Sequence, residues 1–146
     1  MKYWEPKHFI PQEYVPKEIY DVLGDKSLLV MDYRVLKTDD AIREFFGVPV
    51  IINTWHDSKM VKKYGLRRYS GYRPFQCKVG AAFSQHKFGR ASDKVVVGID
   101  IKTVRRAIID NQRHFPYITV IEDKVSWLHT DCRCIIGSEI QLIKGV

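Results

Sequence analysis

The chain has 146 residues, of which 45% are hydrophobic and 28% are charged, as in an ordinary folded protein and unlike a disordered chain. No apolar run approaches the roughly 20 residues that a membrane-spanning helix needs, and the first residues lack the charged-then-apolar layout of a signal peptide. The formal charge of +7 favours anionic partners but does not choose among nucleic acid, an acidic membrane face and a cell-wall polymer.

Residues 1–146 contain no repeat, linker or low-complexity tract, so we expect one domain, with an N-terminal arm over residues 1–29 packed on it. Prolines recur in the first 16 residues and predict an extended segment there. A helix is expected over residues 38–46, where Thr38 can cap, Asp39 and Asp40 favour the positive end, and Gly47 supplies the stop. A strand over 48–52 and a short helix over 57–64 follow.

Residues 66–92 are rich in glycine, arginine, serine and aromatic residues and show no clear period. We expect a long structured loop here, and loops of this length in a compact domain are usually functional or disordered. The elements expected after it are a buried strand over 95–97, an amphipathic helix over 103–114 and strands near 117–121, 125–131 and 138–143. Helices combined with a mostly antiparallel sheet predict an α+β domain.

The three cysteines are Cys77, Cys132 and Cys134. An odd number without a leader predicts reduced thiols in a reducing compartment. A single Cys-x-Cys pair is a weak metal motif, so buried free thiols are the preferred interpretation.

The segment Ser84–Asp93 carries the strongest chemical signal. Gly89 allows a sharp turn and Ala91 allows close backbone packing, so His86 and Asp93 can converge from two sides. Imidazole nitrogen and carboxylate oxygen are both good zinc ligands. Taken alone, the histidine would more often be a hydrogen-bonded surface residue and the aspartate a turn or cap residue.

A second candidate element lies near His129. If residues 125–131 form a strand, His129, Asp131 and Arg133 share one face, while Leu128, Thr130, Cys132 and Cys134 point to the other. His129 can then complete a set of two histidines and one aspartate. Three protein ligands leave a fourth position for water, as in catalytic zinc sites.

The pattern Ser-x-His-x-x-Gly-x-Ala-x-Asp, followed by Trp-x-His-x-Asp, resembles the signature of zinc peptidases with the Hedgehog/D,D-peptidase fold. That family includes D-Ala-D-Ala carboxypeptidases and dipeptidases and phage L-alanyl-D-glutamate endolysins. The resemblance runs from about Val30 to the C-terminus. It includes the segments Met31–Leu36, Val48–Asn53 and Ser70-Gly71-Tyr72-Arg73-Pro74 in the family's order.

The resemblance implies that His86, Asp93 and His129 hold Zn²⁺. It implies that Arg73 contacts the substrate and the developing oxyanion, and that Ser84 has a supporting role near the metal or the substrate. Trp127, the tryptophan of the second motif, is expected to bind substrate. The implied partner is a peptide of bacterial peptidoglycan.

One departure from the family pattern concerns the catalytic base. Many members place a glutamate three residues before the last histidine ligand, where this chain has Ser126. The nearest substitute is Asp131, which could be the base or could instead pair with Arg133 or orient a histidine. Glu122 and Asp123 are more remote candidates.

The function expected from the resemblance is hydrolysis of peptidoglycan peptide bonds, as a carboxypeptidase or an endolysin-type endopeptidase. Such a protein would be monomeric and phage-associated, either held in the cytoplasm until lysis or carried in the virion. One alternative is a zinc-binding structural or binding protein of the same fold that has lost the base. A nucleic-acid-binding protein is the least favoured alternative, because only net charge and the aromatics near Arg67–Arg73 support it.

Overall fold

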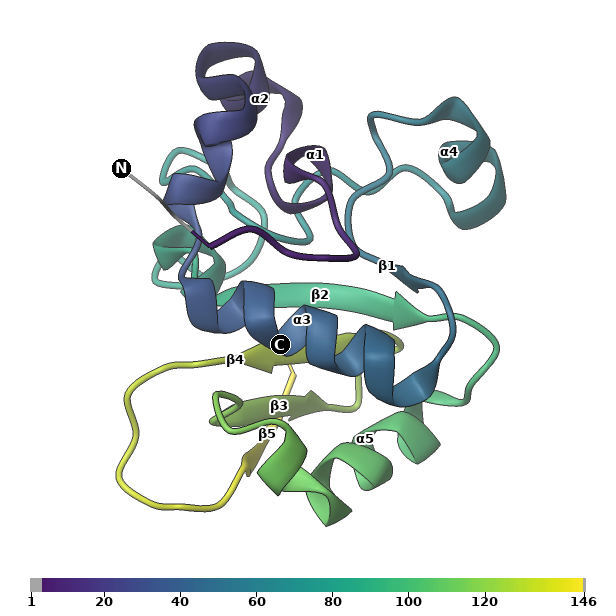
Figure 1. Cartoon of the computed structure of the whole chain (residues 1–146). Coiled ribbons are helices and arrows are strands. Elements are labelled where there is room, and N and C mark those ends of the chain that lie inside the picture. The colour runs from purple at the N-terminus through teal and green to yellow at the C-terminus, as the bar shows by residue number, and fades with distance from the viewer. Residues whose placement is uncertain (1–3, 146) are drawn as a thin grey trace.

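The strands of the computed structural model, which describes residues 4–145, form one five-stranded sheet in the order β1-β2-β4-β3-β5 (Figure 1). All neighbouring strands are antiparallel except β3 and β5, which are parallel. The strands are β1 (Val50–Ile51), β2 (Ala91–Val96), β3 (Val120–Asp123), β4 (Leu128–Asp131) and β5 (Gln141–Lys144). The predicted α+β class, with a mostly antiparallel sheet, is therefore confirmed.

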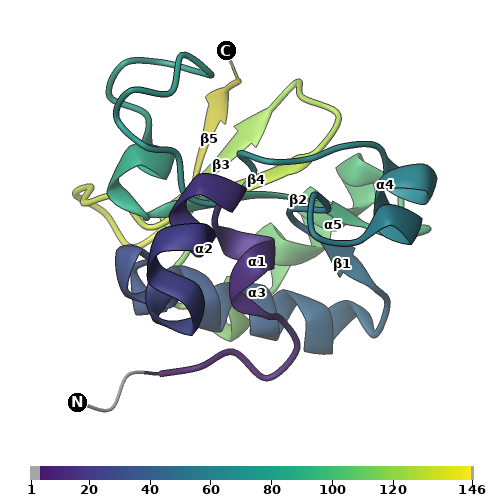
Figure 2. The ribbon, with the colours of Figure 1, turned by 90° about the horizontal axis from the view of Figure 1, so that it is seen from above.

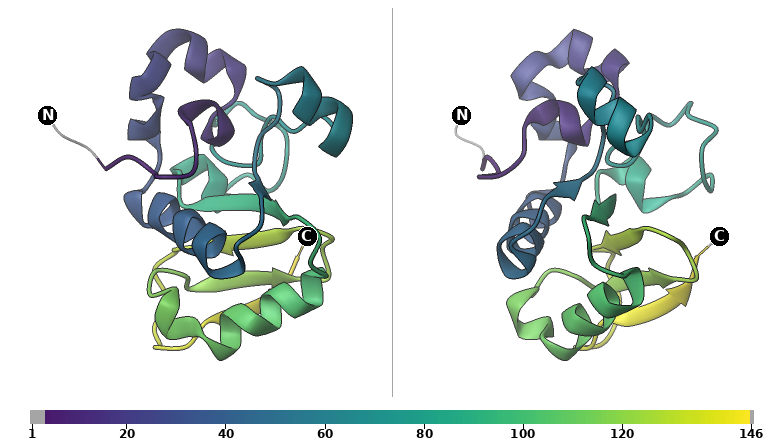
Figure 3. Two further views of the ribbon diagram at one scale, coloured as in Figure 1. Left: turned by 45° about the vertical axis from the view of Figure 1, so that its right-hand side comes forward. Right: turned by 90° about the vertical axis from the view of Figure 1, so that its right-hand side faces the viewer.

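Eight helical segments accompany the sheet among the described residues. They are α1 (Pro11–Tyr14), α2 (Lys17–Leu23), α3 (Tyr33–Phe46), α4 (Ser58–Tyr64) and α5 (Ile101–Asp110), with the 3-10 turns η1 (Gly24–Val30), η2 (Gln85–Phe88) and η3 (Gln112–His114). Helices α3 and α5 lie on one face of the sheet, and the loop over residues 66–84 lies beside the opposite face (Figures 2 and 3). This leaves the second face available for a site.

Helix α3 begins at Tyr33, five residues before the predicted start, because the Asp32 side chain caps it by accepting a hydrogen bond from the Arg34 backbone N–H. Its end at Gly47, in the left-handed conformation, is as predicted. The prediction of Thr38 as the cap is wrong, since Thr38 is buried inside the helix.

The acidic pair in the middle of α3 is used for tertiary contacts and does not serve the helix end. Asp40 accepts hydrogen bonds from the backbone N–H groups of Lys7 and His8, which fastens the N-terminal segment to the helix. Asp39 is fully buried and forms an ion pair of 2.9 Å with Lys94 of β2. Lys94 also donates to the Thr130 hydroxyl at 2.7 Å, so this cluster joins α3 to two central strands.

Replacing Lys94 by Met is expected to lower the free energy of unfolding by about 3–5 kcal/mol, because it leaves the Asp39 carboxylate buried without its cation. Adding Asp39→Asn to that variant should recover part of the loss, since the uncompensated charge is gone. Urea denaturation measures both effects, and exposed Lys62→Met should leave the midpoint unchanged. A double variant no more stable than the single one would contradict the ion-pair explanation.

Residues 4–10 of the N-terminal arm contain no helix, whereas α1 occupies Pro11–Tyr14, where an extended chain was expected. Pro11 stands at the first position of α1 and Pro16 caps α2, positions where a missing N–H is harmless. Residues 1–3 of the predicted arm lie outside the described residues. The arm also supports the loop beyond β1, because the Tyr14 carbonyl accepts a 2.7 Å hydrogen bond from the Tyr72 N–H.

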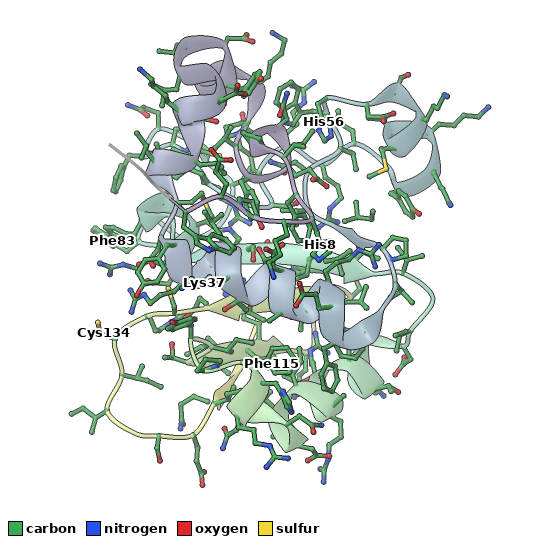
Figure 4. The ribbon with its side chains drawn as sticks, viewed as in Figure 1. His8, Lys37, His56, Phe83, Phe115 and Cys134 are labelled. Atoms are coloured by element: carbon green, nitrogen blue, oxygen red, sulfur yellow. The ribbon has the colours of Figure 1, made fainter. Side chains whose placement is uncertain are left out.

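The three cysteines are free, as predicted, but they are not equally buried. Cys132 belongs to the core, Cys77 is half-buried, and Cys134 is exposed on the loop after β4 (Figure 4). The prediction of burial is wrong for Cys134 because β4 ends at Asp131 and the alternation of faces stops there. Within residues 4–145, no helix has both the length and the apolar character needed to cross a bilayer.

Candidate metal centre

Three buried side chains, His86, Asp93 and His129, meet on the sheet face opposite α3. Their exposed fractions are 2%, 7% and 3%. The His129 Nδ1 atom lies 2.8 Å from Asp93 Oδ1, and His86 Nε2 lies 3.3 Å from each of these two atoms. The residues that the sequence predicted as ligands therefore form one compact triangle of donor atoms.

The size of this triangle fits a tetrahedral zinc ion. Zinc–nitrogen and zinc–oxygen bonds of about 2.0–2.1 Å in tetrahedral geometry separate neighbouring ligand atoms by about 3.3–3.4 Å. Two of the three observed separations are 3.3 Å and the third is 2.8 Å. Two imidazoles and a carboxylate also form a donor set that zinc accepts, with one position left for water or substrate.

Each of the three side chains also has a partner on its other polar atom. The His86 Nδ1–H donates to the Gly71 carbonyl at 2.7 Å, and the His129 Nε2–H donates to Asp131 at 3.1 Å. Because a carbonyl and a carboxylate can only accept, these bonds leave His86 Nε2 and His129 Nδ1 facing the centre of the triangle. Outer partners of this kind fix the orientation of metal-ligating histidines.

The aspartate is held in the same way. Asp93 Oδ2 accepts a 2.8 Å hydrogen bond from Arg73 Nη2, which leaves Oδ1 directed at the two imidazoles. The Arg73 Nε–H donates to the Tyr69 carbonyl at 2.7 Å, so the guanidinium is fixed at two points. The Cβ of any larger residue at Gly80, which has φ +77°, would crowd Arg73 Nη1.

The register of the sheet explains how residues so distant in sequence meet. Asp93 of β2 is the direct antiparallel partner of His129 of β4, so the two side chains stand side by side on one face. Ser92, Lys94 and Thr130 alternate to the opposite face, where they form the cluster with α3.

His86 comes from the turn η2, which ends at Gly89 with φ +66°. A side chain at position 89 would collide with the Val30 carbonyl, so the sharp turn predicted for this glycine is observed and requires glycine.

The charges in the triangle are strongly coupled. Burial alone would raise the pKa of Asp93, but the two neighbouring imidazoles lower it far below its usual range. Burial would lower the pKa of His129, but hydrogen bonds to Asp131 and Asp93 raise it to about 9. Burial lowers the pKa of His86, and the nearby Asp93 offsets this only in part. At pH 7 His129 is therefore protonated, with its Nδ1 directed at Asp93 Oδ1.

Zinc binding at pH 7 is expected to release about one proton, because the metal must displace the proton held by His129 Nδ1. Affinity for zinc should rise with pH and level off above the pKa of about 9. The same raised pKa stabilises the zinc-free fold below pH 6.5, and this contribution is lost as the pH rises through about 9. Titration calorimetry in two buffers of different ionisation enthalpy measures the proton count. An identical heat in both buffers would rule the displacement out.

A pocket of about 360 Å³ opens over the triangle. Its lining includes all three residues predicted to bind substrate: Arg73, Ser84 and Trp127. The lining further includes residues 79–81, 83 and 85 from the segment that leads into η2, and Glu122, Arg133 and Ile143 from the part of the chain that contains β3, β4 and β5. Phe83 of this segment is 81% exposed and stands at the edge of the molecule (Figure 4). The long loop predicted from composition thus borders the site.

The structure separates the candidates for the base. Asp131 is fully buried, bonds the outer nitrogen of His129 and pairs with Arg133, and it does not line the pocket. Glu122 of β3 does line the pocket, with Oε1 4.0 Å from His129 Nε2. Ser126, where the resemblance would imply a glutamate, is exposed and lines a different depression.

From the sequence, Glu122 was a more remote candidate for the base than Asp131, because no motif around Glu122 connects it to the site. The signal that could have found it is strand register. Ile121 pairs with Thr130, so the next residue of β3 comes beside His129. The sequence placed Arg133 on the face of His129 and considered it as a partner of Asp131, and the structure adds that it lines the pocket.

Comparisons of the chain with protein-family models, with curated proteins and with solved structures find no match. The interpretation of the site therefore depends on its own geometry and on the two short motifs.

Proposed function

We propose that this protein is a zinc-dependent peptidase that hydrolyses a peptide bond of bacterial peptidoglycan. The observation that carries the proposal is the triangle of His86, Asp93 and His129 donor atoms, each held by an outer partner, at the floor of a pocket. The resemblance of the motifs around these residues to zinc peptidases of the D,D-carboxypeptidase and endolysin type supports the choice of reaction. Zinc, when bound, supplies a Lewis acid that polarises a scissile carbonyl and activates water near neutral pH.

The chain's own residues account for the remaining needs of amide hydrolysis. Arg73 presents a fixed cation at the pocket wall, where it can stabilise negative charge on the carbonyl oxygen. Losing one such donor costs on the order of 100-fold in rate. Ser84 makes no side-chain hydrogen bond within residues 4–145 and lines the pocket, so its hydroxyl is available to a substrate.

Glu122 is the carboxylate best placed to act as the general base. Its side chain borders the pocket and is partly exposed, so it can take a proton from water and pass it to the leaving amine. Asp131 then serves to orient His129 and to keep its Nε2 protonated. In this proposal Glu122 and Asp131 have different roles, and Glu122 supplies the carboxylate that Ser126 cannot.

Two of the three arginines in residues 67–73 are engaged inside the protein, while Arg68 is exposed. Arg67 donates to the carbonyl of Ile52 at 2.7 Å, and Arg73 is paired with Asp93. Both guanidinium groups are thus used inside the protein, which removes them from a phosphate-binding surface. The remaining basic residues give a general attraction to anionic polymers, among them those of the cell wall.

Incubation of the zinc-loaded protein with purified peptidoglycan, followed by mass analysis of the soluble fragments, tests the proposal. New free termini should appear, and they should be absent after chelation of the metal. The position of the new termini identifies the bond. An unchanged wall in the presence of fully zinc-loaded protein would favour a zinc-binding protein without activity.

A further inference from the structure

Arg133 lines the pocket, and its pairing with Asp131 uses only one edge of its guanidinium group. Its Nε donates to both Asp131 oxygens, at 2.9 and 3.0 Å, and its Nη2 pairs with the same carboxylate. Nη1 donates to no acceptor within residues 4–145, the side chain is 32% exposed, and the residue lines the pocket over the metal centre. A guanidinium fixed along one edge and open along the other is a ready site for an anion.

Arg133 keeps its positive charge in this position. Its hydrogen bonds to Asp131 raise the pKa of the guanidinium, and Glu122 adds to this. A carboxylate reaching Nη1 therefore meets a permanent cation whose rotamer is already set, so little side-chain entropy is lost on binding.

The position of Arg133 relative to Glu122 indicates which half of a substrate it meets. Glu122 belongs to β3 and Arg133 follows β4, whereas Arg73 comes from the loop that precedes η2 and is paired with Asp93 of β2. A general base that hands its proton to the leaving amine must stand next to that amine. The residue that supplies the leaving amine therefore lies on the side of Glu122 and Arg133.

We propose that Arg133 binds a free α-carboxylate on the residue that supplies the leaving amine, which makes this carboxylate a requirement for efficient cleavage. The inference rests on the proposed peptidase function and narrows its substrate class. Bonds that satisfy the requirement include D-Ala-D-Ala, whose leaving D-alanine is C-terminal, and L-Ala-γ-D-Glu, whose leaving glutamate is joined to the next residue through its side chain and keeps a free α-carboxylate. Substrates in which this carboxylate is an amide should be cleaved less efficiently.

The test compares acid and amide forms of two peptides at saturating zinc. One pair is N-acyl-Lys-D-Ala-D-Ala and its C-terminal amide, and the other is an L-Ala-γ-D-Glu peptide and its γ-D-isoglutamine counterpart. A hydrogen bond to a charged group contributes about 1.5–3 kcal/mol, so kcat/KM for the acid should exceed that for the amide by about 10- to 150-fold. The pair that is cleaved identifies the bond.

Arg133→Met should abolish the preference by slowing cleavage of the acid form alone, and Arg133→Lys should restore part of it. The ratio is measured within each variant, so a change in zinc affinity or stability from the loss of the Asp131 contact does not affect the comparison. Exposed Arg113→Met is the matched control and should keep the full preference. Equal cleavage of acid and amide by the unchanged protein would overturn the proposal while leaving the peptidase function intact.

A binding measurement separates the two proposals if no peptide is cleaved. The zinc-loaded protein is titrated with D-alanine and with D-alaninamide and followed by NMR. Binding of D-alanine alone, lost in Arg133→Met, would support the carboxylate site even though the peptidase function had failed. Absence of binding of either compound, together with absence of cleavage, would overturn both.

Discussion

A His86→Ala protein is expected to fold but to bind zinc more than about 100-fold more weakly and to show no measurable peptidase activity. Loss of an outer partner alone typically lowers metal affinity by about 10- to 100-fold, and loss of a direct ligand should exceed this. His86 Nε2 is one of the three donor atoms of the triangle, and nothing among the described residues stands ready to replace it. Zinc content after dialysis against a competing chelator measures the affinity.

The matched control for this substitution is His8→Ala, which removes an exposed histidine that contacts Glu44. It should leave zinc affinity and activity unchanged. Because His86 is buried, its removal could also lower stability, and thermal unfolding of the zinc-free proteins measures that separately. If His86→Ala does not fold, Asp93→Asn tests the same point with an isosteric side chain. Full zinc affinity in a folded variant would show that the triangle is not a metal site.

The meeting of His86, Asp93 and His129 could be predicted from the sequence because local chemistry marks these residues. Gly89 permits the turn that follows His86, and alternation along β4 places His129 and Asp131 on one face. The outer partners could be predicted only in part. Gly71 holds His86 through a backbone carbonyl, and no residue type signals such a contact.

The start of β2 could not be predicted from hydrophobic periodicity, because most of its first residues are polar and yet buried. The strand begins at Ala91, four residues before the predicted start. The prediction started too late because Ser92, Asp93 and Lys94 are polar, and a polar segment is typical of a loop. All three are buried: Asp93 faces His86 and His129 in the triangle, and the other two face Asp39. Polar residues in a strand with both faces covered are invisible to hydrophobic periodicity, since their partners come from distant parts of the chain.

Tertiary partners also explain why Asp39 and Asp40 lie in the middle of α3 and do not mark its start. Two adjacent aspartates suggested a helix N-terminus by the dipole rule, which is worth only a few tenths of a kcal/mol to about 1 kcal/mol at an exposed end. The contacts of Asp39 with Lys94 and of Asp40 with the N-terminal backbone are tertiary and outweigh that preference. Only the fold reveals them.

Replacing Glu122 by Gln is expected to leave zinc affinity nearly unchanged and to lower kcat on the order of 100- to 10,000-fold, the usual contribution of a positioned general base. Glu122 is not a donor atom of the triangle, and its Oε1 lies 4.0 Å from the outer nitrogen of His129. The amide keeps the shape of the side chain but cannot accept the proton. Exposed Glu139→Gln is the matched control and should keep full activity.

Asp131→Asn should give the opposite pattern, with zinc affinity reduced by about 10- to 100-fold and kcat at saturating zinc close to that of the unchanged protein. The physical reason is that Asp131 is fully buried behind His129, where it can fix the imidazole but cannot reach water in the pocket. Measuring zinc affinity and kcat separately for both variants assigns the roles. If Asp131→Asn abolishes turnover at full zinc occupancy while Glu122→Gln remains active, the base is Asp131, and Glu122 only borders the substrate.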